Sequence, residues 1–223
     1  MFDSRFDEVT PKYPRILYDY GGVIAEEGFR EGLYEIARTS GLDEKRFLDK
    51  CADIIYEGGY VIGTSSEGDY WRSVRKETGV NLSDDVMRRQ ILLRFKLREV
   101  MIALVRLLRR KGFWVGVLSD QTNWLAELNE RDGFFKEFDA IFNSYDLGKG
   151  KRDITLFNEI AQRLEAPPEN ILFVDDNPGH VERARLAGLK TILFQETSEV
   201  VEQMQSMGLI SSDDASDLKN TLQ

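Results

Sequence analysis

The chain has 223 residues, 42% of them apolar and 31% charged, which fits one large domain or a core with an inserted subdomain. Its net charge of -9 argues against general affinity for nucleic acid or an anionic membrane, since those partners need a basic surface. The lone Cys51 excludes an internal disulfide and is interpreted as a small buried apolar residue. Because we see neither a secretory signal at the start nor an apolar run that spans a bilayer, a cytoplasmic protein is expected.

Short apolar runs along the chain predict the strands of a parallel sheet. They lie at residues 16–18, 113–118, 138–142, 171–174 and 191–194. Between the later runs, apolar residues at three- and four-residue spacing predict helices around 101–108, 156–164 and 181–186. The alternation of strand and helix over 113–194 indicates an α/β fold with a β-α-β-α-β arrangement.

Residues 25–98 carry almost no strand-like sequence and are predicted to be a helical insert between the first two strands. One helix start is expected within residues 63–67, where a Ser or Thr side chain can cap free amides, and another at Ser83 or Asp84. Such an insert would lie beside the carboxyl edge of the sheet, either as a lid or as an ordinary helical subdomain without a gating role. Its aromatic residues could line a pocket, but aromatic residues of this kind more often form core; they are Tyr34, Tyr56, Tyr60, Tyr70 and Trp71. The tail after residue 197 is expected to dock as a final helix or to fray.

Four polar signatures stand close behind apolar runs. Asp19, Ser119 and the pair Asp175-Asp176 directly follow predicted strands, and Lys151 follows a loop with two glycines. Polar groups at the carboxyl ends of parallel strands meet in one crevice, the usual ligand position in an open α/β sheet. A nucleophilic carboxylate, a hydroxyl, a cation and two acids in one pocket suit phosphoryl transfer with magnesium.

Each signature also has an ordinary explanation when it is taken alone. Asp19 and the Asp175-Asp176 pair fit turns, Ser119 with Asp120 fits a helix cap, and Lys151 fits a solvated basic loop. Two adjacent acids after a buried run repel each other unless a cation compensates them, and hard oxygen ligands favour Mg²⁺. The only histidine, His180, has no cysteine partner, so zinc is not expected and a loop or helix-start position is the better interpretation.

In this order the four signatures resemble the motifs of the haloacid dehalogenase-like (HAD) hydrolase superfamily, and the resemblance spans residues 15–194. Residues 144–151 are similar to the stretch that leads into the family's lysine, and residues 177–188 to the segment after its acidic pair. The resemblance implies a three-layer Rossmann-like parallel-sheet core formed by residues 1–24 and 99–223. It also implies that residues 25–98 form an α-helical cap domain between the first and second motifs.

The resemblance assigns roles to individual residues. It implies that Asp19 is the nucleophile and a Mg²⁺ ligand, with the Gly21 carbonyl as a second ligand. Ser119 and Lys151 would bind the phosphoryl group and act in catalysis. The substrate-binding set is completed by backbone and loop residues, namely Gly21, Gly22 and Asp120. Asp175 and Asp176 would complete the metal site, directly or through water.

Two departures from the family pattern stand out. Family phosphatases usually carry Asp-x-Asp, in which the second acid protonates the leaving group and then activates water. This chain has the Asp-x-Gly-Gly variant, with Gly21 at that position, and Arg152 where proline commonly follows the family's lysine. Because general acid–base help is worth about 10²–10⁴-fold, Gly21 favours leaving groups that need little protonation, such as a glycosyl or acyl phosphate.

Three functions therefore remain open. The first is a Mg²⁺-dependent phosphatase that hydrolyses a small phosphorylated metabolite, such as a sugar phosphate, through an aspartyl-phosphate intermediate on Asp19. The second is a non-catalytic protein that binds phosphate or a protein partner. The third is a 2-haloacid dehalogenase, which Gly21 permits but the two adjacent acids oppose, because they would repel an anionic substrate in the absence of metal. The sequence gives no indication of the oligomeric state.

Overall fold

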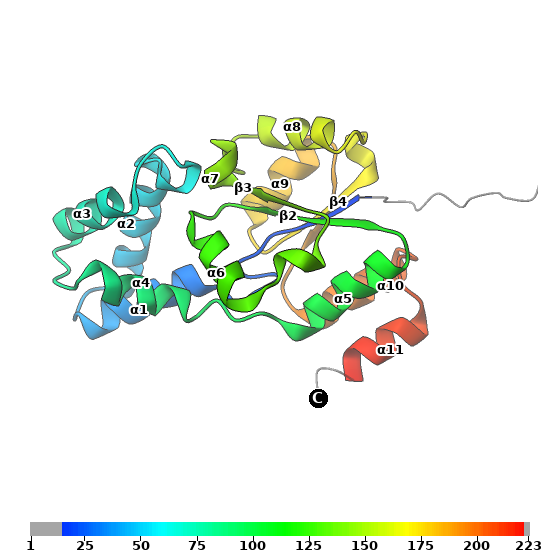
Figure 1. The fold of residues 1–223 in the computed structure, drawn as a ribbon, viewed down its shortest axis with the longest axis horizontal. Helices are drawn as coiled ribbons and strands as arrows, with labels where there is room; N and C mark the ends of the chain where they lie inside the picture. The colour runs from blue at the N-terminus through cyan, green and yellow to red at the C-terminus, as the bar shows by residue number, and fades with distance from the viewer. Residues whose placement is uncertain (1–14, 221–223) are drawn as a thin grey trace, which may run out of the picture.

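The computed structural model describes residues 15–220, and a five-stranded parallel sheet forms its centre (Figure 1). The strand order is β3-β2-β1-β4-β5. The strands are β1 (Arg15–Tyr18), β2 (Trp114–Ser119), β3 (Ala140–Asn143), β4 (Ile171–Asp175) and β5 (Lys190–Leu193). This arrangement confirms the predicted α/β class, and residues 1–14 of the expected core lie outside the described part of the chain.

Strand β1 lies at the centre of the sheet and is buried on both faces. Leu17 is in register with Gly116 of β2 on one side and with Phe173 of β4 on the other. Ile16, Leu17 and Tyr18 have no exposed surface, as expected for a parallel strand covered by helices on both sides. Successive residues of β1 belong to different apolar clusters, one on each face, so the core has three layers.

Helices cover both faces of the sheet (Figure 1). On one face pack α5 (Glu99–Arg110), α6 (Trp124–Asp132), α10 (Thr197–Ser206) and α11 (Ser212–Asn220); on the other pack α8 (Thr155–Arg163) and α9 (Pro178–Leu186). The polar tail therefore docks, with Val200 and Met204 of α10 fully buried. Helix α9 starts earlier than predicted because proline is tolerated in the first turn, where the Asn177 side chain caps the Gly179 amide at 2.8 Å.

The insert between β1 and α5 is helical, as predicted. It consists of α1 (Gly28–Thr39), α2 (Glu44–Glu57), α3 (Glu67–Thr78) and α4 (Asp84–Leu92), with a 3-10 turn at Tyr60–Ile62. Ser66 caps α3 in a capping box, and Ser83 rather than Asp84 caps α4. These four helices gather at one end of the molecule, beside α6 and the short helix α7 (Ser144–Leu147) (Figure 1).

The chain enters and leaves this insert at one place. Ala25 and Leu97 form an antiparallel bridge, and the Glu26 amide donates to the Lys96 carbonyl at 2.8 Å. Beyond the crossing, the insert is fastened to α6 by aromatic and polar contacts: Trp71 stacks on Trp124 with ring centroids 6.0 Å apart. No helix within residues 15–220 is long and apolar enough to cross a membrane.

Candidate active site

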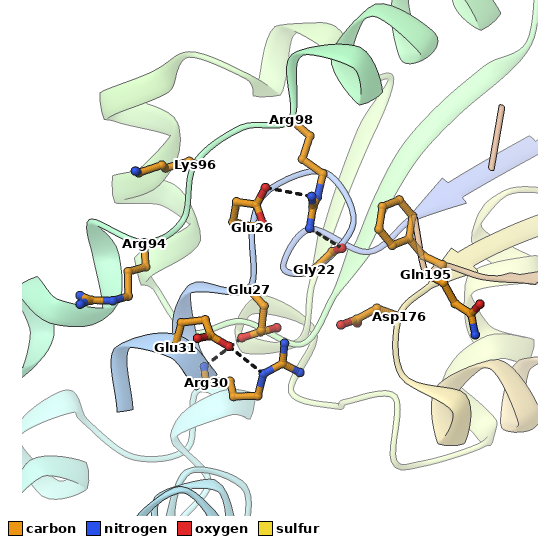
Figure 2. A pocket seen from close by; sticks show the side chains of 11 residues that line it. Gly22, Glu26, Glu27, Arg30, Glu31, Arg94, Lys96, Arg98, Asp176 and Gln195 are labelled. Atoms are coloured by element: carbon orange, nitrogen blue, oxygen red, sulfur yellow. Dashed lines mark hydrogen bonds and ion pairs between the residues drawn. The ribbon is translucent and has the colours of Figure 1, made fainter. Parts of the chain in front are cut away.

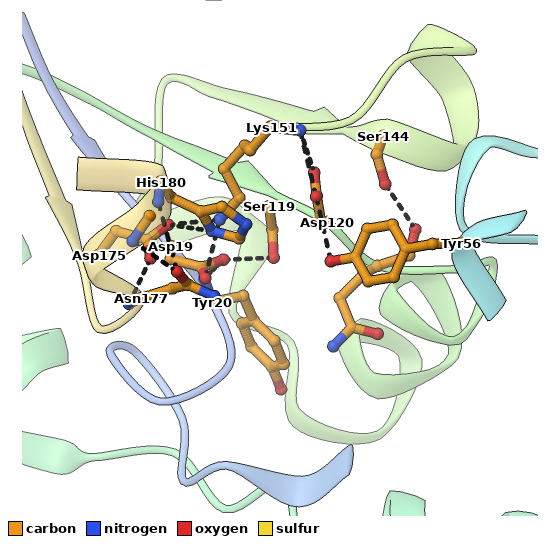
Figure 3. Close-up of polar contacts among 12 residues, drawn as sticks. Asp19, Tyr20, Tyr56, Ser119, Asp120, Ser144, Lys151, Asp175, Asn177 and His180 are labelled. Atoms are coloured by element: carbon orange, nitrogen blue, oxygen red, sulfur yellow. Dashed lines mark hydrogen bonds and ion pairs between the residues drawn. The ribbon is translucent and has the colours of Figure 1, made fainter. Parts of the chain in front are cut away.

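Three of the predicted residues lie at the carboxyl edge of the sheet because each one ends a strand or follows it directly. Asp19 follows β1, Ser119 ends β2 and Asp175 ends β4. The Ser119 hydroxyl donates to Asp19 Oδ1 at 2.6 Å, and the Tyr20 amide donates to the same oxygen at 2.7 Å (Figure 3). The end of β2 and the backbone just after β1 thus hold one oxygen of the Asp19 carboxylate in a fixed position.

Lys151 joins the site from the loop between α7 and α8, and its side chain is completely buried. Its ammonium lies 2.8 Å from Asp19 Oδ2 and 2.6 Å from Asp175 Oδ2, between the two carboxylates (Figure 3). Burial pushes the pKa of Lys151 down, but the charges of Asp175 and Asp19 outweigh it and hold that pKa above its ordinary value. Lys151 therefore remains a cation in the interior.

His180 is a site residue that the sequence did not identify. It lies in the first turn of α9, as expected, but its imidazole is buried and its Nδ1 lies 3.3 Å from Asp175 Oδ2. The Asn177 amide donates to the other oxygen of Asp175 at 2.7 Å. Burial would raise the pKa of Asp175, yet Lys151 and His180 hold it well below its ordinary value.

Negative charge at this edge exceeds the positive charge that faces it. Burial raises the pKa of Asp19, and the charges of Asp175 and Asp176 raise it further, although Lys151 opposes them. The pKa of Asp176 is also raised, first by burial and then by the charge of Asp175. Three acids meet one fully buried ammonium, with Arg30 as a further cation that faces Asp176, and a divalent cation bound among the acids would relieve their mutual repulsion.

The residues present fit a magnesium ion. Asp19, Asp175 and His180 each place a potential ligand atom within 4.8 Å of the others, and Asp176 follows Asp175 and lines the same cavity as Asp19 and His180. Carboxylate oxygens predominate, and Mg²⁺ needs only one or two carboxylates because it keeps several waters. One imidazole and no nearby thiol do not make the usual zinc set.

Asp120, expected among the substrate-binding residues, is engaged with other parts of the protein. Its carboxylate accepts from the Lys151 amide at 2.9 and 3.1 Å and from the Tyr56 hydroxyl of α2 at 3.2 Å (Figure 3). Asp120 therefore fixes the Lys151 loop and ties the helical insert to β2. Arg152, where the family commonly has proline, stacks its guanidinium 3.6 Å from the centre of the Tyr56 ring on the same side.

The two glycines after Asp19 meet different surroundings. Gly22 has φ +79°, and a Cβ there would lie 2.3 Å from Asp176 Oδ2, so glycine is required for both reasons. Gly21 lies outside the left-handed region, and a Cβ there would lie 3.2 Å from a Phe95 ring carbon and 3.5 Å from Glu27 Oε2. Position 21, where the family acid is missing, therefore lies next to the Glu27 carboxylate.

A cavity of about 410 Å³ opens in front of Asp19 and Ser119, under the helical insert. Asp176, Arg30 and Arg183 contribute charged groups to its wall. The insert contributes a mainly apolar wall, formed by Phe29, Leu48, Ala52, Ile55, Tyr56 and Val61. The α2 members, at positions 48, 52, 55 and 56, share one helix face because residues three and four apart are neighbours on a helix.

A second hollow adjoins this cavity on the other side of Gly22. Glu27, Arg30 and Asp176 border both spaces, and the second one is lined further by Lys96 and Arg98 (Figure 2). Arg98 is paired with Glu26 at 2.8 Å. Five of the predicted site residues line the first cavity, namely Asp19, Gly21, Ser119, Asp120 and Asp176. Its charged or titratable lining residues that the sequence did not single out for the site include Glu27, Arg30, Arg183 and His180, and Tyr56 lines it as one of the aromatic residues considered for a pocket.

Residues 10–188 match the haloacid dehalogenase-like hydrolase family. The chain belongs to this family. Solved structures of the HAD fold superpose on it at low sequence identity. A predicted HAD-like hydrolase from Porphyromonas gingivalis is 19% identical with a TM-score of 0.71, over 90% of this chain and all of the other. A HAD family enzyme from Bacteroides thetaiotaomicron, in complex with magnesium and inorganic phosphate, is 16% identical with a TM-score of 0.59. The match covers 84% of this chain and 98% of that enzyme.

Curated relatives of this HAD-like hydrolase match over shorter stretches. A drimenol cyclase of Aspergillus calidoustus is 36% identical over 31% of this chain, and a phosphatase of Mycobacterium tuberculosis is 30% identical over 46%. The bifunctional epoxide hydrolase 2 of Mus musculus is 24% identical over 61% of this chain. The matched stretch spans 13%, 50% and 26% of these three relatives respectively, so it covers at most half of each.

Proposed function

We propose that this HAD-like hydrolase is a Mg²⁺-dependent phosphatase that acts on a small phosphorylated metabolite through an aspartyl-phosphate intermediate on Asp19. The observation that carries the proposal is the buried Lys151 ammonium between Asp19 and Asp175, with the Ser119 hydroxyl on the opposite oxygen of Asp19. This arrangement places a carboxylate nucleophile among groups that bind phosphoryl oxygens. Similarity to a phosphatase, and to a fold neighbour that holds magnesium and phosphate, supports it.

The proposed chemistry assigns a task to each residue. Asp19 attacks phosphorus, while Ser119, Lys151 and the backbone of Gly21-Gly22 hold the phosphoryl oxygens as negative charge develops on them. Asp19, the Gly21 carbonyl, Asp175 and Asp176 would hold magnesium, which would neutralise the charge of phosphate and carboxylates in the site. The Asp120 carboxylate acts indirectly by holding the Lys151 amide. Water then hydrolyses the acyl phosphate and regenerates Asp19.

We also propose that residues 25–98 act as a cap domain over the core of residues 1–24 and 99–223. The insert lies over the cavity and supplies most of its apolar wall. A face formed by Phe29, Ala52 and Ile55 favours an ester whose non-phosphate part is partly apolar, and a sugar phosphate is the more polar alternative. A cytoplasmic location stays a prediction.

The test is turnover of a panel of phosphate esters, including a sugar phosphate and a short alkyl phosphate, with and without Mg²⁺. The wild type should release phosphate only with the metal, and Asp19→Asn should lose activity while keeping its fold by circular dichroism. Glu44→Gln, at a partly exposed acid at the start of α2 that pairs with Arg38 and does not line the cavity, is a control that should retain full activity. Equal activity of wild type and Asp19→Asn would disprove the nucleophile assignment.

Two alternatives give different results in the same assay. A non-catalytic phosphate-binding protein, which Gly21 keeps open, would bind inorganic phosphate with Mg²⁺ but release none from any ester. A dehalogenase, which the similarity to a dehalogenase structure (13% identity, TM-score 0.63 over 83% of this chain) keeps open, would release halide from a 2-haloacid in the presence of chelator. The excess of carboxylates at the site disfavours the second alternative.

A further inference from the structure

The acid that the family carries at the position of Gly21 is missing from this chain, but another acidic side chain lies close to that position in the structure. A Cβ built on Gly21 would lie 3.5 Å from Glu27 Oε2, so a carboxylate from six residues further along the chain approaches the same place. Glu27 borders the cavity that also contains Asp19 and Ser119. Figure 2, which draws the adjoining second hollow, shows the Glu27 carboxylate directed toward Asp176.

The carboxylate of Glu27 is held in position by the backbone around it. Glu27 is the N-cap of α1, and its Oε1 accepts from the Arg30 amide at 3.0 Å. The preceding residue, Glu26, is tied to Lys96 through the backbone crossing of the insert. One oxygen of Glu27 therefore fixes the side chain, and the other faces Gly21.

The other acidic side chains in or beside this cavity already have partners or proposed tasks. Asp175 holds His180, and Asp120 accepts from the Tyr56 hydroxyl. Asp176 lies beside Asp175 and is assigned to the metal site. Among the described residues that line the cavity, Glu27 is the acid that lies near the gap without such a task.

On the basis of the proposed phosphatase function, we propose that Glu27 is the proton donor and acceptor of the reaction. As Asp19 attacks phosphorus, the bond from phosphorus to the leaving oxygen breaks, and the Glu27 carboxyl gives its proton to that oxygen. The products of this step are an alcohol, the acyl phosphate and the Glu27 carboxylate. When water attacks the acyl phosphate, the carboxylate takes the proton of that water, inorganic phosphate leaves and Asp19 is regenerated.

The variant Glu27→Gln tests this role, because its amide oxygen can still cap α1. For hexyl phosphate, whose leaving group needs a proton, kcat/KM should fall by about 10²–10⁴-fold. For p-nitrophenyl phosphate, whose leaving group does not, kcat/KM should change little. The kcat for p-nitrophenyl phosphate should fall, because the base that activates water for hydrolysis of the acyl phosphate is lost. Nitrophenol should therefore appear in a burst as the acyl phosphate accumulates.

Matched variants separate this role from a structural one. Gly21→Asp in the Glu27→Gln background should restore turnover of hexyl phosphate, whereas Gly21→Ala in that background should not. The backbone conformation permits both changes because Gly21 is outside the left-handed region, and both require the Phe95 ring, 3.2 Å from the built Cβ, to move by a few tenths of an ångström. Glu26→Gln, at the neighbouring exposed acid, should leave both esters unaffected.

An equal loss of kcat/KM on the two esters, or the absence of a burst, would overturn the role of Glu27. Failure of the underlying phosphatase proposal is distinguishable, because the wild type would then turn over neither ester with Mg²⁺. Binding of inorganic phosphate with Mg²⁺, measured by calorimetry, should be the same in wild type and Glu27→Gln. A loss of that binding would show that Glu27 serves the binding site rather than proton transfer.

Discussion

Lys151→Met provides a direct test of how the site is held together. The ammonium of Lys151 is fully buried and lies 2.6 Å from Asp175 and 2.8 Å from Asp19, so the substitution leaves two carboxylates without their cation. Removal of one partner from a buried ion pair typically costs about 3–5 kcal/mol. We therefore expect the free energy of unfolding at neutral pH to fall by about that amount, together with a loss of turnover.

The loss should depend on pH in a defined direction. In the wild type, Lys151 and His180 hold the pKa of Asp175 down against burial. The ionised Asp175 carboxylate therefore contributes to the free energy of unfolding above about pH 4, and this contribution is lost as the pH falls further. In Lys151→Met the main opposing charge is gone, and burial should raise the pKa of Asp175. The carboxyl then takes up a proton on mild acidification, so the difference between variant and wild type should shrink between about pH 8 and about pH 5.5.

Urea unfolding followed by circular dichroism, in the presence of chelator, measures this difference at both pH values. The control is Lys149→Met, two residues away, where the lysine pairs with Glu159 and Asp153 at the surface. Its effect should be small and insensitive to pH because water solvates these partners once the lysine is removed. Equal losses in the two variants, or a loss in Lys151→Met that does not change with pH, would refute the reasoning.

Three further outcomes follow from the same geometry. Gly22→Ala should cost about 1 kcal/mol or more from its φ of +79° alone and should weaken Mg²⁺ binding by displacing Asp176, as thermal unfolding and metal titration would show. Ile55→Ala should raise the KM for hexyl phosphate several-fold and leave inorganic phosphate affinity unchanged, because each buried methylene is worth roughly 0.8 kcal/mol. Burial raises the pKa of Cys51 to about 12, so a thiol reagent should label it only after unfolding.

The sequence was sufficient to predict which strand ends meet. Asp19, Ser119 and Asp175 each follow an apolar run, and adjacent parallel strands bring their carboxyl ends to one edge regardless of the details of the loops. The helices of the insert were equally readable, because Ser66 and Ser83 mark two of their starts. These features depend on short-range patterns, which a single sequence contains.

The burial of individual side chains in the loops was not readable in the same way. Lys149 and Lys151 are two cations in one short loop, yet one pairs with Glu159 at the surface and the other has no exposed surface. The path of the loop decides between them, and Asp120 on a different strand fixes that path by accepting the Lys151 amide. Likewise, His180 was expected at a helix start, but its contact with Asp175 depends on how α9 packs against the end of β4.

Glu26 and Glu27 show the same limit at the entrance to the insert. In the sequence they are two equivalent acids, but the backbone crossing at Ala25 and Leu97 turns one toward Arg98 and the other toward Gly21. The sequence motif therefore lacks an acid at Gly21, but in the structure the Glu27 carboxylate lies beside that position. Because Glu27 caps the first helix of the insert, any change in the orientation of the insert would move this acid and the apolar wall together, relative to Asp19.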